Sequence, residues 1–375
     1  MAAAVIIIIA IGAVGAWILI TNPFAPTTPT ETTSTSTTET TSTTTTTTGL
    51  PANPYDVAIV FATGGLGDKS FNDGCYTGAQ KAVTDFGISF TYVEPTAITE
   101  YEGYIRTYAE HADYADPYSL IVTIGFDQQD ALQAVAADYP DQQFAIVDTY
   151  VNESIYANVA SLLFAENEGS ALVGAVAGLM TETDKIGFVG GMDIPLINKF
   201  LAGYKFGANY TNNGINVTYA YTNNWVDTSV GQTLADGMYA GGADIIFAAA
   251  GRSGLGVFDS CEATIGTNST PIWTIGVDSP QMYLGTADPD NPTAPTFCLT
   301  SMLKRVDVAV YNMIRDAHFG NFTGGPKTFN LANNGVDYEI NTDLLTLPPS
   351  VITAVNDLKA LIIAGTVTVP AEIYW

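Results

Sequence analysis

The sequence predicts an α/β protein with two doubly wound lobes that face each other across a cleft. Apolar strand-like runs alternate with helix-like stretches from Tyr55 onward, which is typical of parallel sheets. The alternation forms two successive series, one on each side of the helix-like stretch Glu166 to Met180. A chain of 375 residues is also too long for one core, so we expect two lobes of roughly 100 to 150 residues each.

The amino-terminal segment is predicted to tether the protein to a membrane. Ala2 to Ile20 is an uncharged apolar run of about the length that spans a bilayer. No basic region precedes it and no cysteine for lipid attachment follows it, which favours an uncleaved anchor at residues 1–22 over a cleaved signal peptide. Residues 23–54 are rich in Thr and Ser, which suits an extended stalk. The predicted location is the cell membrane, with the globular part outside the cell.

Five Asn-x-Ser/Thr triplets agree with an exterior location. They begin at Asn152, Asn209, Asn216, Asn268 and Asn321.

The first series of elements is predicted to build the first lobe. Its strand-like runs are Val57 to Phe61, Ile88 to Val93, Leu120 to Ile124, Phe144 to Val147 and Val159 to Leu163. Helix-like stretches such as Tyr101 to His111 and Gln128 to Tyr139 separate these runs, as in a βαβ arrangement.

The second series repeats this pattern and predicts the second lobe. Its strand-like runs are Lys185 to Val189, Ile215 to Tyr221, Ile245 to Ala248 and Trp273 to Val277. The run Phe297 to Met302 and the helix Val306 to His318 are then expected to return to the first lobe. The predicted boundaries are 55–163 with 279–319 for the first lobe, 164–278 with 320–345 for the second, and 346–375 for a carboxyl-terminal helix and tail.

The stretch Gly64 to Gly74 is the first candidate for a binding site. It follows a strand-like run and precedes a helix, where open α/β sheets bind their ligands. Its glycines allow close approach of a ligand, and Asp68, Ser70 and Asn72 supply polar groups beside Phe71. The alternative is structural, with Asp68 or Ser70 capping the helix and Phe71 in the core.

Composition and motifs exclude several classes of function. The net charge of −26 disfavours nucleic acid as a partner. No metal or cofactor is expected, because Cys75, Cys261 and Cys298 lie far apart and Gly64 to Gly67 matches neither a P-loop nor a full dinucleotide motif. Buried free thiols are expected, with a bridge between Cys261 and Cys298 as the alternative. Two histidines, both in helical patterns, give no sign of a catalytic site.

Five segments resemble, in order and at fitting distances, the basic membrane protein (Bmp) family of purine-nucleoside receptors. These receptors are extracytoplasmic solute-binding components of ABC transporters. The segments are Gly64 to Asn72, Gly190 to Ile197, Ala249 to Val257, Ile275 to Asp278 and Thr300 to Asp307. The resemblance covers Tyr55 to Pro370 and implies a type I periplasmic-binding-protein fold whose lobes are joined by three hinge crossings. It also implies a permease as partner.

The resemblance implies a set of ligand-binding residues. The base side of the pocket would be formed by Asp68, Phe71 and Asn72, by Asp130 after the Gly125-Phe126 turn, and by Trp225 in place of a stacking phenylalanine. Gly251 and Gly254 would bring the backbone near the ligand, and Asp278 and Lys304 would hold the ribose hydroxyls.

The residue types fit this chemistry independently. Aromatic faces suit a flat base, and carboxylates accept hydrogen bonds from hydroxyl and ring N–H groups. Three carboxylates with one lysine favour nucleosides over nucleotides. Asp278 could instead cap a helix, and Asp148 and Asp193 are expected at turns or the hinge rather than against the ligand. The alternative functions are a sugar receptor or sensor of the same fold and, less favoured, a nucleoside hydrolase, for which the clustered Asp-x-Asp pattern is missing.

Overall fold

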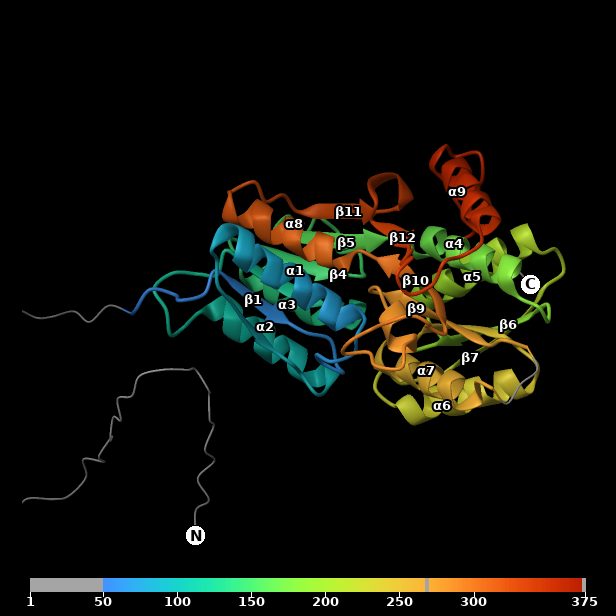
Figure 1. Cartoon of the computed structure of the whole chain (residues 1–375). Coiled ribbons are helices and arrows are strands. Elements are labelled where there is room, and N and C mark those ends of the chain that lie inside the picture. The colour runs from blue at the N-terminus through green and yellow to red at the C-terminus, as the bar shows by residue number, and fades with distance from the viewer. Residues whose placement is uncertain (1–49, 267–269, 373–375) are drawn as a thin grey trace, which may run out of the picture. The chain divides into compact units, whose positions relative to one another are not determined.

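The first sheet consists of parallel strands in the order β11-β5-β4-β3-β1-β2 (Figure 1). The computed structural model describes residues 50–266 and 270–372, so the predicted anchor and most of the predicted stalk lie outside the described residues. The strands of this sheet are β1 (Val57–Val60), β2 (Phe90–Val93), β3 (Leu120–Ile124), β4 (Phe144–Val147), β5 (Val159–Phe164) and β11 (Gly325–Phe329). Its central strands are buried along their whole length, as expected for a sheet covered on both faces.

Helices cover both faces of this sheet. Ile59 packs in one core cluster with residues of α1 (Phe71–Phe86) and α8 (Val306–His318), whereas Val60 packs with residues of α2 (Tyr101–Glu110) and α3 (Gln129–Asp138). Successive strand residues point to opposite faces, so the two helix pairs lie on opposite sides. The first lobe is therefore a three-layer α/β/α unit.

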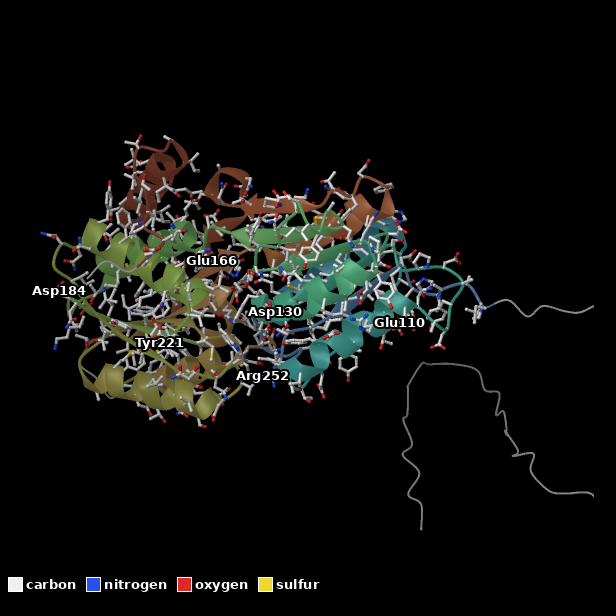
Figure 2. The ribbon with its side chains drawn as sticks, turned by 180° about the vertical axis from the view of Figure 1, so that it is seen from behind. Glu110, Asp130, Glu166, Asp184, Tyr221 and Arg252 are labelled. Carbon is white, nitrogen blue, oxygen red and sulfur yellow. The ribbon has the colours of Figure 1, made fainter. Side chains whose placement is uncertain are left out.

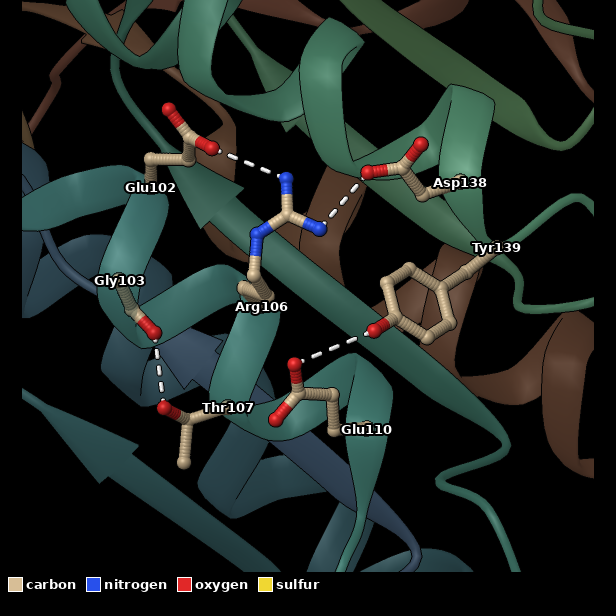
Figure 3. A network of polar contacts seen from close by, with 7 residues as sticks. All are labelled: Glu102, Gly103, Arg106, Thr107, Glu110, Asp138 and Tyr139. Atoms are coloured by element: carbon tan, nitrogen blue, oxygen red, sulfur yellow. Dashed lines mark hydrogen bonds and ion pairs between the residues drawn. The ribbon is translucent and has the colours of Figure 1, made fainter.

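A polar network joins α2 to α3 on the outside of the first lobe (Figure 3). The Arg106 guanidinium contacts Glu102 at 2.9 Å on its own helix and Asp138 at 2.7 Å on α3. Tyr139 donates to Glu110 across the same helix pair, at 3.3 Å. These side chains are partly or fully exposed, so the network contributes little to stability and mainly fixes how the two helices lie.

The second sheet has the order β12-β10-β9-β8-β6-β7, with only β12 antiparallel to its neighbour. Its strands are β6 (Lys185–Gly190), β7 (Asn216–Tyr221), β8 (Ile245–Ala249), β9 (Trp273–Asp278), β10 (Cys298–Lys304) and β12 (Val336–Tyr338). Its helices are α4 (Glu166–Met180), α5 (Pro195–Thr211), α6 (Thr228–Ala240), α7 (Leu255–Thr264) and, packed on α4, α9 (Pro349–Ile363).

Glycines bring α4 and α5 into close contact. A Cβ at Gly174 would meet the carbonyl oxygen of Tyr204 at 2.2 Å, and one at Gly207 would meet that of Ala171 at 1.9 Å. Both distances are shorter than atoms tolerate, so these two helices can pack backbone to backbone only with glycine at these positions.

The structure corrects two of the predicted lobe assignments. The run Phe297 to Met302 does not return to the first lobe, because β10 pairs with β9 in the second sheet. Residues 325–329, expected in the second lobe, form β11 beside β5 in the first. Each of these two strands is followed by a segment that passes from one lobe to the other. Their apolar pattern does not indicate which sheet they join. The helix α8 packs against α1 of the first lobe.

The chain crosses between the lobes three times, after β5, after β10 and after β11. The crossing segments are hydrogen-bonded to one another. Ala165 N–H donates to Phe329 at 2.9 Å, and Arg305 N–H donates to Gly335 at 2.9 Å. Neighbouring crossing strands of this kind form a natural hinge.

All three cysteines are buried free thiols, as predicted. The alternative disulfide between Cys261 and Cys298 is absent.

Candidate ligand-binding site

A cavity lies where the carboxyl ends of the two sheets meet. It contains about 740 Å³ of empty space, counting the part open to solvent. Its walls come from both lobes. They include seven of the nine residues predicted to lie at the ligand, namely Asp68, Phe71, Asn72, Trp225, Gly251, Asp278 and Lys304, but neither Asp130 nor Gly254.

Asp68 is both a wall residue and a helix cap. Its carboxylate accepts hydrogen bonds from the backbone N–H groups of Ser70, Asn72 and Asp73, at 2.9, 2.8 and 3.1 Å. Burial raises the pKa of Asp68 above its usual value, although these hydrogen bonds favour the charged form. The structural alternative considered for Asp68 therefore holds in the structure, alongside its place in the cavity wall.

The side chain of Asn72 is held in place on both sides. Its Oδ1 accepts from Ala62 N–H at 3.1 Å, and its Nδ2 donates to Asp68 at 3.2 Å. The residue thus ties the start of α1 to the end of β1.

Two aromatic residues line the cavity from opposite lobes, Phe71 at the start of α1 and Trp225 in the loop after β7. The indole lies directly on the backbone of Gly191, where an added Cβ would meet Trp225 Cζ3 at 2.1 Å. Gly251 lies against the same ring, since a Cβ added there would be 3.7 Å from Trp225 Cε3. Glycine at 191 is therefore required for the position of the indole.

Lys304 is buried at the end of β10 and pairs with two acids. Its Nζ lies 2.6 Å from Asp148 Oδ1 and 3.2 Å from Glu166 Oε1, and also within 5.5 Å of the rings of Phe71, Phe164 and Phe200. Burial alone would lower the pKa of Lys304, but Asp148, Glu166 and Asp278 raise it above its usual value. Burial raises the pKa of Asp148 to about 6. Asp148 sits at a turn with φ of 75°, as expected, and it also lines the cavity.

Asp278 ends β9 and contacts the opposite lobe. Ser70 Oγ donates to Asp278 Oδ2 at 2.6 Å. Burial raises the pKa of Asp278 to about 7, against the opposing effects of Lys304 and Ser70. The next residues strengthen this contact, because Ser279 Oγ donates to Ser70 and Gln281 Nε2 donates to Lys69. The second lobe therefore holds the glycine-rich loop of the first from several points.

Asp130 was predicted to lie on the base side of the pocket, but it does not line the cavity. It is an exposed residue in the first turn of α3 (Figure 2), where a carboxylate stabilises the helix dipole. Asp127, three residues nearer to β3, lines the cavity instead and accepts from Tyr101 at 3.1 Å. Asp193 lies in a turn outside the cavity wall and accepts from Asn198 at 3.0 Å.

Several wall residues were missed, among them Phe126, Asp127, Leu196, Ile197, Phe200 and Arg252. Asp127 and Asp148 both closely follow a strand, so the rule that ligands bind beyond strand ends could have found them. Arg252 lies in the segment Ala249 to Val257, from which only the glycines Gly251 and Gly254 were predicted to approach the ligand.

The family model for PnrA-like ABC transporter substrate-binding proteins, named Bmp, matches residues 55–372. The chain belongs to the Bmp family. The ABC transporter nucleoside-binding protein BmpA of Lactococcus lactis is 33% identical over 322 residues, covering 84% of this chain and 89% of that protein. An uncharacterized lipoprotein of Pyrococcus abyssi is 35% identical over 294 residues, covering 76% of this chain and 69% of that protein.

A solved structure agrees with the fold. An ABC transporter solute-binding protein from Aeropyrum pernix K1 superposes with a TM-score of 0.74 at 29% identity, covering 84% of this chain and 94% of that one. This Bmp protein is therefore an ABC transporter solute-binding protein with a periplasmic-binding-protein-like fold of two parallel-sheet lobes.

Two features are absent from the described residues of this Bmp protein. Residues 50–266 and 270–372 contain no group of three or more His, Cys, Asp or Glu side chains able to hold a metal ion. The same part of the chain has no helix long and apolar enough to span a bilayer.

Proposed function

We propose that this protein captures a nucleoside, with a purine as its base, between the two lobes and delivers it to the permease of an ABC importer. The observation that carries the proposal is the shared cavity of Phe71, Trp225, Asp278 and Lys304. It combines ring faces with buried hydrogen-bonding groups, which is the combination a nucleoside needs. The name of the Lactococcus lactis relative points to the same ligand class.

The base is proposed to stack on Trp225, with Phe71 lining the same site. Aromatic stacking on a base contributes roughly 1–3 kcal/mol and needs no particular base identity. A tryptophan offers a larger face than the phenylalanine expected at its position, and the glycines at 191 and 251 leave the indole room to lie flat against the backbone.

The sugar hydroxyls are proposed to lie at the other end of the cavity, near Asp278 and Lys304. An ammonium group has three N–H donors, and two of those of Lys304 point to Asp148 and Glu166. The third would donate to a ribose hydroxyl, while Asp278 would accept from one. The cavity wall has four acidic side chains, of Asp68, Asp127, Asp148 and Asp278, and two basic ones, of Lys304 and Arg252. This excess of acidic groups would favour nucleosides over nucleotides.

The protein is further proposed to act as a receptor and not as an enzyme, and to be held at the outer face of the cell membrane by its amino-terminal segment. The lipoprotein name of the Pyrococcus abyssi relative supports a membrane location for that protein. Cell fractionation of the full chain tests the tether, since an untethered protein would stay in the supernatant after membranes are sedimented.

Thermal unfolding with a panel of ligands tests the proposed ligand class. A ligand that binds only the native state stabilises it by RT ln(1 + [L]/Kd), about 2.7 kcal/mol at one hundred times Kd. Purine nucleosides should raise the melting temperature, and free pentoses or nucleoside monophosphates should raise it little. A shift with a sugar and none with any nucleoside would favour the sugar receptor, and release of free base from inosine would favour the hydrolase.

A further inference from the structure

Arg252 clasps the two lobes together beside the proposed base site. It lies in the short helix η3 (Gly251–Gly254), after β8 of the second lobe (Figure 2). Its Nη2 donates to the carbonyl oxygens of Gly64 at 2.9 Å and Leu66 at 2.6 Å, both in the glycine-rich loop of the first lobe. A single guanidinium nitrogen therefore makes both contacts across the cavity.

The rest of this guanidinium has unused hydrogen-bonding capacity. Its Nε is buried and has no hydrogen-bond partner among the described residues. No carboxylate within that part of the chain forms an ion pair with Arg252, in contrast to Lys304, which has two. Arg252 lines the cavity, so the N–H groups of its guanidinium that face the cavity and are not used by the two carbonyls are available to an acceptor on the ligand.

The position of Arg252 relative to Trp225 decides which part of the ligand it would meet. Both neighbours of Arg252 touch Trp225: Gly251 lies against its indole, and Ser253 N–H donates to its carbonyl oxygen at 3.2 Å. A base stacked on the indole would then present an edge, and not a face, to the guanidinium. The acceptor pair O6 and N7 of a 6-oxopurine is the base edge that arginine most commonly recognises.

A carboxylate lies in the opposite wall. Asp127 Oδ2 accepts from Tyr101, whose hydroxyl in turn accepts from Thr63 N–H at 2.8 Å, next to the Gly64 that Arg252 holds. The other oxygen of Asp127 keeps lone pairs that could accept from a ring N–H, which a 6-oxopurine carries beside O6. Adenosine has an amino group in place of O6 and an unprotonated N1.

Resting on the proposed function, we propose that Arg252 donates to the 6-oxo edge of the base and so makes inosine and guanosine the preferred ligands over adenosine. Discrimination of this kind typically amounts to a factor of about 5 to 150 for a good bidentate contact. Both two-donor edges of a guanidinium include Nη2, which the two carbonyls already occupy, so the base receives a single N–H donor. For one charge-assisted contact we expect inosine to bind about tenfold more tightly than adenosine.

Calorimetry with inosine and adenosine tests this assignment on the wild type, Arg252→Met and Arg252→Lys. Arg252→Lys keeps a cation that can reach the carbonyls of Gly64 and Leu66, but it has no second nitrogen that could donate to the base at the same time. The inosine to adenosine ratio should fall from about tenfold to below threefold in both variants. Arg315→Met, which removes a partly exposed arginine paired with its neighbour Asp316, should keep the wild-type ratio.

The outcomes are distinguishable. Equal wild-type affinities for inosine and adenosine, or a ratio that survives in Arg252→Lys while both ligands weaken together, would overturn the assignment and leave Arg252 as a clasp only. In either case nucleoside binding, and with it the proposed function, would stand. Failure of both nucleosides to bind the wild type would overturn the two together.

Discussion

Ser70 and Asp278 belong to different lobes, yet the hydroxyl of Ser70 donates a hydrogen bond of 2.6 Å to Asp278 Oδ2 across 208 residues of sequence. The same carboxyl group has its pKa raised to about 7, chiefly by burial. The contact between the lobes therefore includes a group that titrates near neutral pH.

Stability should fall as the pH rises through the titration of Asp278. Between pH 4 and pH 7 the native state binds one proton more than the unfolded state at this group, so unfolding becomes easier as that proton is lost. Below about pH 4 Asp278 has no effect of this kind on the free energy of unfolding. Above pH 7 it lowers that free energy by on the order of 2–4 kcal/mol. Asp278→Asn, measured by urea unfolding at pH 4.5 and pH 8, should remove that part of the pH dependence.

Asp130→Asn is the matched control, because it makes the same Asp-to-Asn change at an exposed position on α3. Identical pH profiles for Asp278→Asn and the wild type would show that Asp278 does not titrate differently in the native state.

Lys304→Met should destabilise the protein strongly. The change leaves Asp148 and Glu166 buried without their cation, and breaking a buried pair in this way costs about 3–5 kcal/mol. Urea unfolding of the triple variant with Asp148→Asn and Glu166→Gln should recover more than half of that loss. Lys81→Met, which breaks an exposed pair with Asp85, should cost far less than Lys304→Met, and an equally small loss for Lys304→Met would contradict the account.

Asp68→Ala should lower stability by about 1–2 kcal/mol through loss of the cap on α1. The variant leaves three backbone N–H groups at the start of this helix without their acceptor. Asp68→Asn keeps one acceptor oxygen and should lose less. Equal losses for the two variants, measured by urea unfolding, would argue that the charge and not the hydrogen bonding is what matters.

Gly191→Ala should weaken nucleoside binding without changing any group proposed to touch the ligand. The added methyl group would overlap the indole of Trp225 and push it from its place. Calorimetry should give a loss near that of Trp225→Ala, about 1–3 kcal/mol. Gly237→Ala is the control, since a Cβ there meets no atom within 4 Å. Unchanged affinity in Gly191→Ala would mean that the indole does not stack on the base.

The alternation of elements was predictable because strands buried on both faces leave continuous apolar runs in the sequence, as at Val57 to Phe61. The assignment of β10 and β11 to their sheets was not predictable, since each strand lies next to a crossing between the lobes and pairs with a strand from another part of the chain. Seven of the nine predicted residues line one cavity because strand ends in a doubly wound sheet converge. Asp130 failed for a local reason: after the turn at Gly125 the short helix η2 (Phe126–Gln128) leaves Asp127, and not Asp130, in the wall.

Contacts between side chains distant in sequence could not be predicted at all. The pairing of Lys304 with Asp148 and Glu166, and the clasp of Arg252 on Gly64, join residues more than a hundred positions apart. No local sequence pattern predicts these contacts, because they form only when the two lobes come together.

Isothermal titration of the full chain with inosine, guanosine and adenosine tests the central claim most directly. The account predicts a single site per chain with a dissociation constant in the micromolar range or below, weakened by Trp225→Ala. No heat from any of the three nucleosides, together with saturable heat from a free sugar, would contradict it.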